Sequence, residues 1–138
     1  MNSAWLIDNS AYQRLWRHPM IQDWTTLIHR GLVTISVISL LEIGYSARNG
    51  SDWRKEIKQS AVSHMPLLSL TPAIETRALR VQELLADRGL HRAPSIADLL
   101  IAATAELSGL AVLTHDKDFG LIAEITGQPV ASLNDLPS

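Results

Sequence analysis

Short runs of consecutive apolar residues recur along the chain, and each is bounded by residues that favour turns. The first run, Trp5-Leu6-Ile7, ends at Asp8, which begins a turn-forming triplet. Runs of this length, rich in branched and aromatic side chains, predict buried strands. The same signal occurs at four later places, residues 32–35, 67–70, 110–114 and 130–133.

The segments between these runs carry apolar residues three and four positions apart, the spacing that predicts amphipathic helices. Pro72 opens one predicted helix over residues 72–87, and Gly89 follows its end. Gly109 ends another that begins near Ile96. The remaining predicted helices cover residues 11–17, 21–30, 38–48 and 119–125, with a polar amphipathic segment over residues 52–64.

Strands that alternate with helices, and that are apolar throughout, indicate a mostly parallel sheet covered on both faces. We therefore predict a three-layer α/β/α fold with four to five strands, in one domain over residues 1–138. In such sheets the functional groups gather beyond the carboxyl ends of the strands. Asp8 and Asp116 both follow a predicted strand directly.

Composition narrows the chemistry that this fold can carry. The chain has no cysteine, which excludes disulfides, thiolate nucleophiles and cysteine-bound zinc. It shows neither a signal peptide nor an apolar run long enough to span a bilayer, so we expect a cytoplasmic protein without a membrane partner.

The formal net charge of −2 conceals an uneven distribution of charge. Basic residues gather in two stretches, over residues 48–58 and 77–92. Several acids, by contrast, stand at the ends of predicted elements. An acidic pocket with a basic rim is consistent with this pattern, although solvated helix faces explain basic runs equally well.

Each acid that follows a strand or opens a helix also has a purely structural explanation. Asp8 is suited to cap the helix that begins near Ser10. Glu42 lies three residues after Ser39, and Asp98 three residues after Ser95, so both fit a capping box.

Two acids in one short turn, Asp116 and Asp118, are more than capping requires. If these carboxylates converge with Asp8, Glu42 and Asp98, they need a counter-charge, because like charges at about 4 Å repel by roughly 4 kcal/mol at an effective dielectric of 20. Oxygen ligands favour Mg²⁺ or Mn²⁺, which bind phosphate oxygens and activate water. The combination favours phosphodiester hydrolysis.

Four segments, in this order and with these intervals, resemble the acidic motifs of PIN-domain nucleases, and most closely those of VapC-type toxins. The resemblance covers nearly the whole chain. Its segments are Leu6-Ile7-Asp8-Asn9-Ser10-Ala11, Ser39-Leu40-Leu41-Glu42-Ile43-Gly44, Ser95-Ile96-Ala97-Asp98-Leu99-Leu100-Ile101-Ala102 and Leu113-Thr114-His115-Asp116-Lys117-Asp118-Phe119.

The resemblance implies an endoribonuclease dependent on Mg²⁺ or Mn²⁺, with metal on Asp8, Asp98 and Asp116 and with Glu42 completing the catalytic quartet. By the same analogy, Ser10, Thr114 and Asp118 support the site. It further implies the toxin of a type II toxin–antitoxin pair, with RNA such as transfer RNA as substrate, a VapB-type antitoxin as partner, and a homodimer.

Two alternatives remain open at this point. A receiver domain shares the length and the acidic pocket, but it needs an aspartate after the third strand, where this chain has Leu70-Thr71-Pro72. A catalytically silent PIN-like module that binds RNA or protein would have the same fold, because fold does not fix function.

Overall fold

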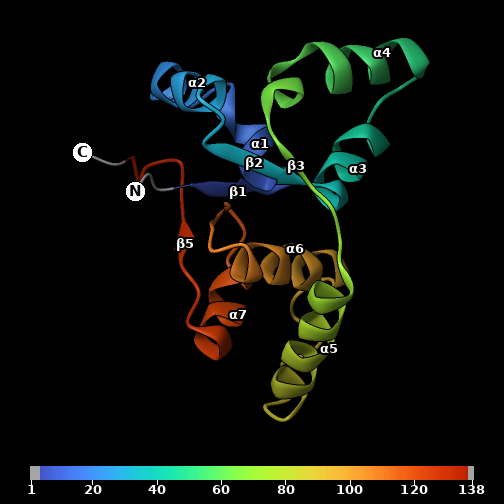
Figure 1. Cartoon of the computed structure of the whole chain (residues 1–138), viewed down its shortest axis with the longest axis vertical. Helices are drawn as coiled ribbons and strands as arrows, with labels where there is room; N and C mark the ends of the chain where they lie inside the picture. The colour runs from blue at the N-terminus through green and yellow to red at the C-terminus, as the bar shows by residue number, and fades with distance from the viewer. Residues whose placement is uncertain (1–3, 137–138) are drawn as a thin grey trace.

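Five short strands form one parallel sheet at the centre of the structure (Figure 1). A computed structural model describes residues 4–136; residues 1–3 and 137–138, which the single-domain prediction includes, lie outside the described residues. The strand order is β3-β2-β1-β4-β5, and every pair is parallel. The strands are β1 (Trp5–Ile7), β2 (Val33–Ser36), β3 (Leu67–Leu68), β4 (Ala111–Leu113) and β5 (Val130–Ala131).

Helices cover both faces of this sheet, which confirms the three-layer prediction (Figure 1). One layer contains α1 (Asn9–Leu15) and α2 (Ile21–His29), and the other contains α5 (Pro72–Ala86), α6 (Ile96–Leu107) and α7 (Asp118–Thr126). Between them α3 (Val37–Tyr45) contacts both α1 and α6. An arm of three short turns follows: α4 (Gly50–Arg54), the π-helix η1 (Lys55–Gln59) and the 3₁₀ helix η2 (Ala61–His64).

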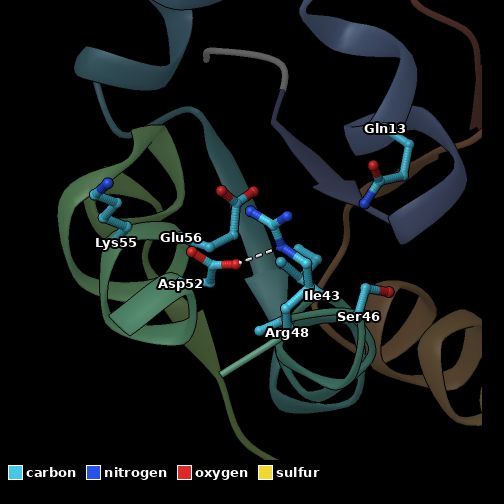
Figure 2. Close-up of a pocket in the computed structure, with 8 residues that line it drawn as sticks. Gln13, Ile43, Ser46, Arg48, Asp52, Lys55 and Glu56 are labelled. Atoms are coloured by element: carbon cyan, nitrogen blue, oxygen red, sulfur yellow. Dashed lines mark hydrogen bonds and ion pairs between the residues drawn. The ribbon is translucent and has the colours of Figure 1, made fainter. Parts of the chain in front are cut away.

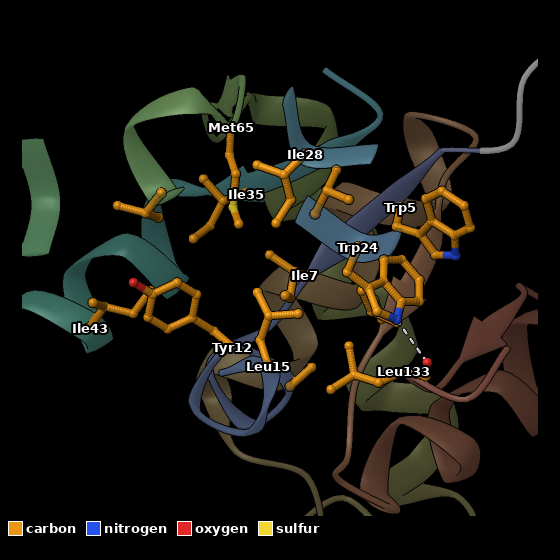
Figure 3. Packing of buried hydrophobic residues seen from close by; sticks show 14 residues of the cluster. Trp5, Ile7, Tyr12, Leu15, Trp24, Ile28, Ile35, Ile43, Met65 and Leu133 are labelled. Atoms are coloured by element: carbon orange, nitrogen blue, oxygen red, sulfur yellow. Dashed lines mark hydrogen bonds between the residues drawn. The ribbon is translucent and has the colours of Figure 1, made fainter. Parts of the chain in front are cut away.

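The strands are apolar throughout because successive side chains enter opposite cores. Trp5 and Ile7 pack with α1 and α2, whereas Leu6 packs with α5, α6 and α7. Within the first core Trp24 is fully buried, and its indole Nε1 donates a hydrogen bond of 2.8 Å to the carbonyl oxygen of Leu133 (Figure 3). The polar atom of this large side chain is therefore satisfied, as burial requires.

One local interpretation was wrong. The capping box expected at Ser39 and Glu42 does not form, because β2 runs into α3 without a loop and Ser36 is the N-cap; its hydroxyl accepts from the backbone N–H of Ser39. Glu42 therefore lies inside α3 and not in its first turn. The polar amphipathic segment over residues 52–64, to which no single element was assigned from sequence, contains three short turns of different type.

The strand order also removes the receiver domain as an alternative. Receiver domains have the order 2-1-3-4-5, in which the third strand lies beside the first. Here β2 and β4 flank β1, and β3 is at the edge. No helix within residues 4–136 has the length and apolarity needed to cross a membrane.

Candidate functional site

The predicted acids gather at the carboxyl ends of β1 and β4, where the strand order reverses. From β1 the chain proceeds outward to β2 and β3, and then returns to place β4 on the other side of β1. The connections after β1 and β4 consequently diverge, and this leaves the crevice in which open α/β sheets bind their ligands. The backbone N–H of Asp8 bonds the carbonyl oxygen of Leu113 at 3.0 Å, which holds the two strand ends together.

Asp8 is the most firmly held of the acids. It is 4% exposed, and it is the N-cap of α1, because its Oδ1 accepts from the N–H of Ala11 at 2.9 Å. The hydroxyl of Thr114 donates to Oδ2 at 2.6 Å, and the hydroxyl of Ser10 lies 2.8 and 2.9 Å from the two oxygens. The predicted capping role and the functional position therefore coincide in one residue.

The same two hydroxyls hold the loop that follows β4. The backbone N–H of His115 donates to Ser10 Oγ at 2.9 Å, and the N–H of Asp116 donates to Thr114 Oγ1 at 2.9 Å. One residue further, the N–H of Asp118 donates to Asp116 Oδ1 at 2.9 Å. The positions of Asp116 and Asp118 are thus tied, through Ser10 and Thr114, to Asp8.

Asp98 is positioned by the start of α6, where the predicted capping box does form. Asp98 N–H donates to Ser95 Oγ at 3.0 Å, and Ser95 N–H donates to Asp98 Oδ2 at 3.2 Å. This exchange fixes the carboxylate and leaves the other oxygen, Oδ1, without a hydrogen-bonding role in the cap.

Glu42 projects from the middle of α3 and is half-buried. Burial raises its pKa, and the nearby charges of Asp98 and Asp8 raise it further. Burial likewise raises the pKa of Asp98, with added repulsion from Asp116 and Asp8 and with an opposing effect of the Ser95 backbone N–H. The acids of four separate segments are therefore close enough to repel one another.

Burial also raises the pKa of Asp8, although the hydrogen bonds from Thr114, Ala11 and Ser10 act in the opposite direction. The charge of Asp116 adds a smaller upward effect. Even with three donors, the Asp8 carboxylate is thus less acidic than in water. A cation in the crevice would relieve the repulsion shared by these groups.

Three of the acids form a group that fits such a cation. Asp98, Asp116 and Asp118 each offer a carboxylate oxygen, and these oxygens lie within 4.8 Å of one another. All are half-buried oxygen ligands, the donor type that Mg²⁺ and Mn²⁺ prefer. The structure brings Asp98 and Asp116 together as the sequence predicted, and adds Asp118 in place of Asp8, whose oxygens face the donors described above.

Sequence reasoning treated Asp118 as auxiliary and did not place it in this group of three carboxylates. The available signal was its spacing. Asp116 and Asp118 are two residues apart in the turn that opens α7, and the turn folds back so that Asp116 accepts from the N–H of Asp118. Their carboxylates then lie on the same side of the turn as Asp98.

Comparison with known proteins agrees with this geometry. The profile of the PIN domain family matches residues 8–125, a range that begins at Asp8 and includes every acid of the site, and the chain belongs to this family. Among curated proteins it is 56% identical to Ribonuclease VapC2 of Mycobacterium tuberculosis, over 99% of this chain and 96% of the relative. It is 43% identical to Ribonuclease VapC51 of the same species, over 94% and 92%. Its relatives are thus VapC ribonucleases.

Solved structures show the same fold at much lower identity. The DNA-bound VapBC structure from Salmonella typhimurium superposes with a TM-score of 0.76 at 20% identity, and the match covers 95% of this chain and 98% of that chain. The arrangement of the layers is therefore retained where most of the sequence differs.

Proposed function

We propose that the protein is a metal-dependent endoribonuclease that acts as the toxin of a VapBC-type pair. The observation that carries this proposal is the convergence of five carboxylates at the switch point of a PIN fold, with three of them grouped within 4.8 Å. The curated relatives named as VapC ribonucleases support the activity.

In this proposal Asp98, Asp116 and Asp118 hold Mg²⁺ or Mn²⁺. When bound there, the ion would polarise a phosphate oxygen as a Lewis acid and would lower the pKa of water. The Asp8 carboxylate is held in place by the hydroxyls of Ser10 and Thr114. Through Thr114 it positions the loop after β4, which carries two of the cation ligands.

Glu42 has a different task. The influences on its pKa are burial and neighbouring acids, with no hydrogen bond among them, so its carboxylate is free to bind a water molecule. A base with a raised pKa is better matched to proton transfer near neutral pH. Glu42 therefore accepts one proton of the attacking water as its oxygen bonds to phosphorus. The P–O bond to the 3′ oxygen, in line with the attack, breaks, and this oxygen takes up a proton from solvent, which leaves a 3′-hydroxyl and a 5′-phosphate.

The partners follow from the structural relatives, several of which are described as VapBC complexes. We propose a VapB-type antitoxin that covers the acidic crevice, a homodimer, and action in the cytoplasm, where RNA substrates are available. The intact set of acids argues against a catalytically silent module, which would have no need of five converging carboxylates.

The test is cleavage of total cellular RNA by the wild type and by Asp98→Asn, in Mg²⁺, Mn²⁺ or EDTA, with new 5′ ends mapped by sequencing. Because the ligands act as a unit, Asp98→Asn should reduce the rate by about 10³-fold or more. Asp23→Asn, an exposed acid in the first turn of α2, is the matched control and should cleave normally. Equal cutting by both variants, or cutting in EDTA, would contradict the proposal.

A further inference from the structure

Two hollows flank the acids, and each includes one acid of the site in its wall. The first, of about 430 Å³, lies between α1 and α3 and includes Glu42 and Tyr45. The second, of about 370 Å³, lies at the carboxyl ends of β4 and β5 and includes Asp116 and Lys117. Both hollows therefore open beside the acidic centre.

The wall of the first hollow presents an uncovered aromatic ring. Tyr45 is the last residue of α3 and is 91% exposed. It lies three residues after Glu42, so the two side chains share a helix face. Leu41, 65% exposed, lines the same hollow. An exposed ring beside a catalytic carboxylate is a platform on which a nucleobase can stack.

The wall of the second hollow carries the ammonium group of Lys117 together with the carboxylates of Asp116 and Asp135. His115 and Lys117 are both exposed, and among residues 4–136 no carboxylate lies within ion-pair distance of Lys117. The ammonium group is thus available to a phosphate of a bound strand, beside an acid that would hold the neighbouring phosphate through a cation.

A third hollow, of about 390 Å³, continues from the first and shares Ser46 with it. Figure 2 shows Arg48 at its rim, with Nε 2.9 Å from Asp52 Oδ2; the Arg48 side chain remains 87% exposed. This hollow lies on the basic stretch that the sequence indicated. Its wall carries two basic and two acidic side chains, Arg48, Lys55, Asp52 and Glu56, so it continues the path without a net charge.

We propose that a single-stranded RNA lies across the carboxyl edge of the sheet, with the base on one side of the scissile phosphate stacked on Tyr45 and the next phosphate on the other side bound by Lys117. This inference rests on the proposed function. The strand is single because a paired base cannot present its face to a side chain. Stacking on Tyr45 tolerates any base, so this position contributes affinity without sequence preference.

The test measures binding of a fluorescein-labelled, mixed-sequence RNA of 12 nucleotides to the full chain carrying Asp98→Asn, in Mg²⁺, at several KCl concentrations. Tyr45→Ala should weaken binding about tenfold with an unchanged salt dependence, because base stacking releases no counterions. Tyr45→Trp should restore the affinity.

Lys117→Gln should weaken binding less, about threefold, but should lower the slope of log affinity against log salt by about 0.7, the value for one phosphate contact on a single strand. Leu107→Ala, which removes a side chain 50% exposed at the far end of α6, and Arg88→Gln, after α5, are the matched controls. Neither should change affinity by more than about twofold.

A second readout locates the strand directly. Cross-linking of RNA that contains 4-thiouridine, followed by mass spectrometry, should label peptides with Tyr45 and His115. Cross-links confined to α5 and α6, or unchanged affinity in both variants, would overturn the path and leave the Tyr45 face to a protein partner. Failure of the nuclease proposal is separate, because it is read from cleavage by the wild type, whereas the path is read from binding and cross-links.

Discussion

The two sides of the acidic crevice are built in opposite ways. On the strand side, Asp8 is buried and accepts hydrogen bonds from Ala11, Ser10 and Thr114. On the helix side, Glu42 stands on α3 beside other acids, and Asp98 has only the cap of its own helix. Three donors partly offset the cost of burying the Asp8 carboxylate, whereas repulsion between neighbouring acids adds to the cost of burying Glu42 and Asp98.

The difference shows how the fold keeps a cluster of like charges in place. Asp8 joins β1, α1 and the loop after β4 into one rigid corner, which tolerates the charge because three donors point at it. Glu42 and Asp98, which stand on helices, can therefore lack enough hydrogen-bond donors to offset their charge. The corner and the helix caps still fix their positions. A cation bound there would relieve the repulsion among them.

The largest effect on stability is expected when the Asp8 carboxylate is removed from the rigid corner. Asp8→Ala removes the N-cap of α1 and the acceptor for two hydroxyls, so the free energy of unfolding should fall by about 3 kcal/mol. Asp98→Ala should change it by less than about 1 kcal/mol, because the loss of the cap is offset by relief of repulsion. Urea unfolding in EDTA measures both. Equal destabilisation by the two substitutions would contradict the comparison.

A smaller effect is expected when Asp8 stays in the corner but loses one of its hydrogen-bond donors. Thr114→Val removes the hydroxyl that links Asp8 to the backbone of Asp116, and it should reduce kcat/KM for RNA by about 10- to 100-fold. Thr114→Ser should recover most of the rate. Thr104→Val is the control, since the Thr104 hydroxyl is also buried but bonds only the carbonyl oxygen of Leu100 within α6. A similar loss in both valine variants would indicate a packing defect.

The smallest expected effect lies on the helix side and depends on pH. Because the pKa of Glu42 is raised in the folded protein, the folded state binds its proton more readily than the unfolded chain does. Without metal, stability should therefore increase as pH falls from neutral toward the ordinary value of 4.5, and decrease as pH rises through the raised pKa.

Glu42→Gln should accordingly be more stable than the wild type in EDTA at pH 7.5, by no more than about 0.5 kcal/mol because solvent screens a half-exposed group. The advantage should shrink at low pH. Glu124→Gln, at an exposed position of α7, provides the control in the same urea titrations. An advantage that is unchanged between pH 7.5 and pH 5 would show that repulsion is not its cause.

The pattern of apolar runs was sufficient to predict the three layers and the positions of the strands along the chain. Strands buried on both faces are apolar throughout, which makes them recognisable in the sequence. The acids Asp8 and Asp98 were also predictable, since each stands in a local cap whose residues are adjacent in sequence. The resemblance to PIN-domain motifs then connected these acids with Glu42 and Asp116, which local patterns alone could not do.

The features of the site that could not be predicted from sequence depend on contacts between distant segments. Ser39 and Glu42 have the spacing of a capping box, yet the absence of a loop after β2 makes Ser36 the cap. The grouping of Asp118 with Asp98 depends on how the turn before α7 folds, and no periodicity encodes that. The exposure of Tyr45 is likewise invisible in sequence, where a tyrosine inside an apolar helix is typical of a core residue.

The insertion of β4 beside β1 has a consequence for the timing of synthesis. Asp8, Glu42 and Asp98 are all translated before β4, but the hydroxyl that holds Asp8 and the acids that complete the cation group belong to residues 114–118. A nascent chain that ends before Thr114 carries three of the acids and has no assembled centre. Assembly of the acidic centre therefore waits until residues 114–118 have been synthesised and have joined the fold.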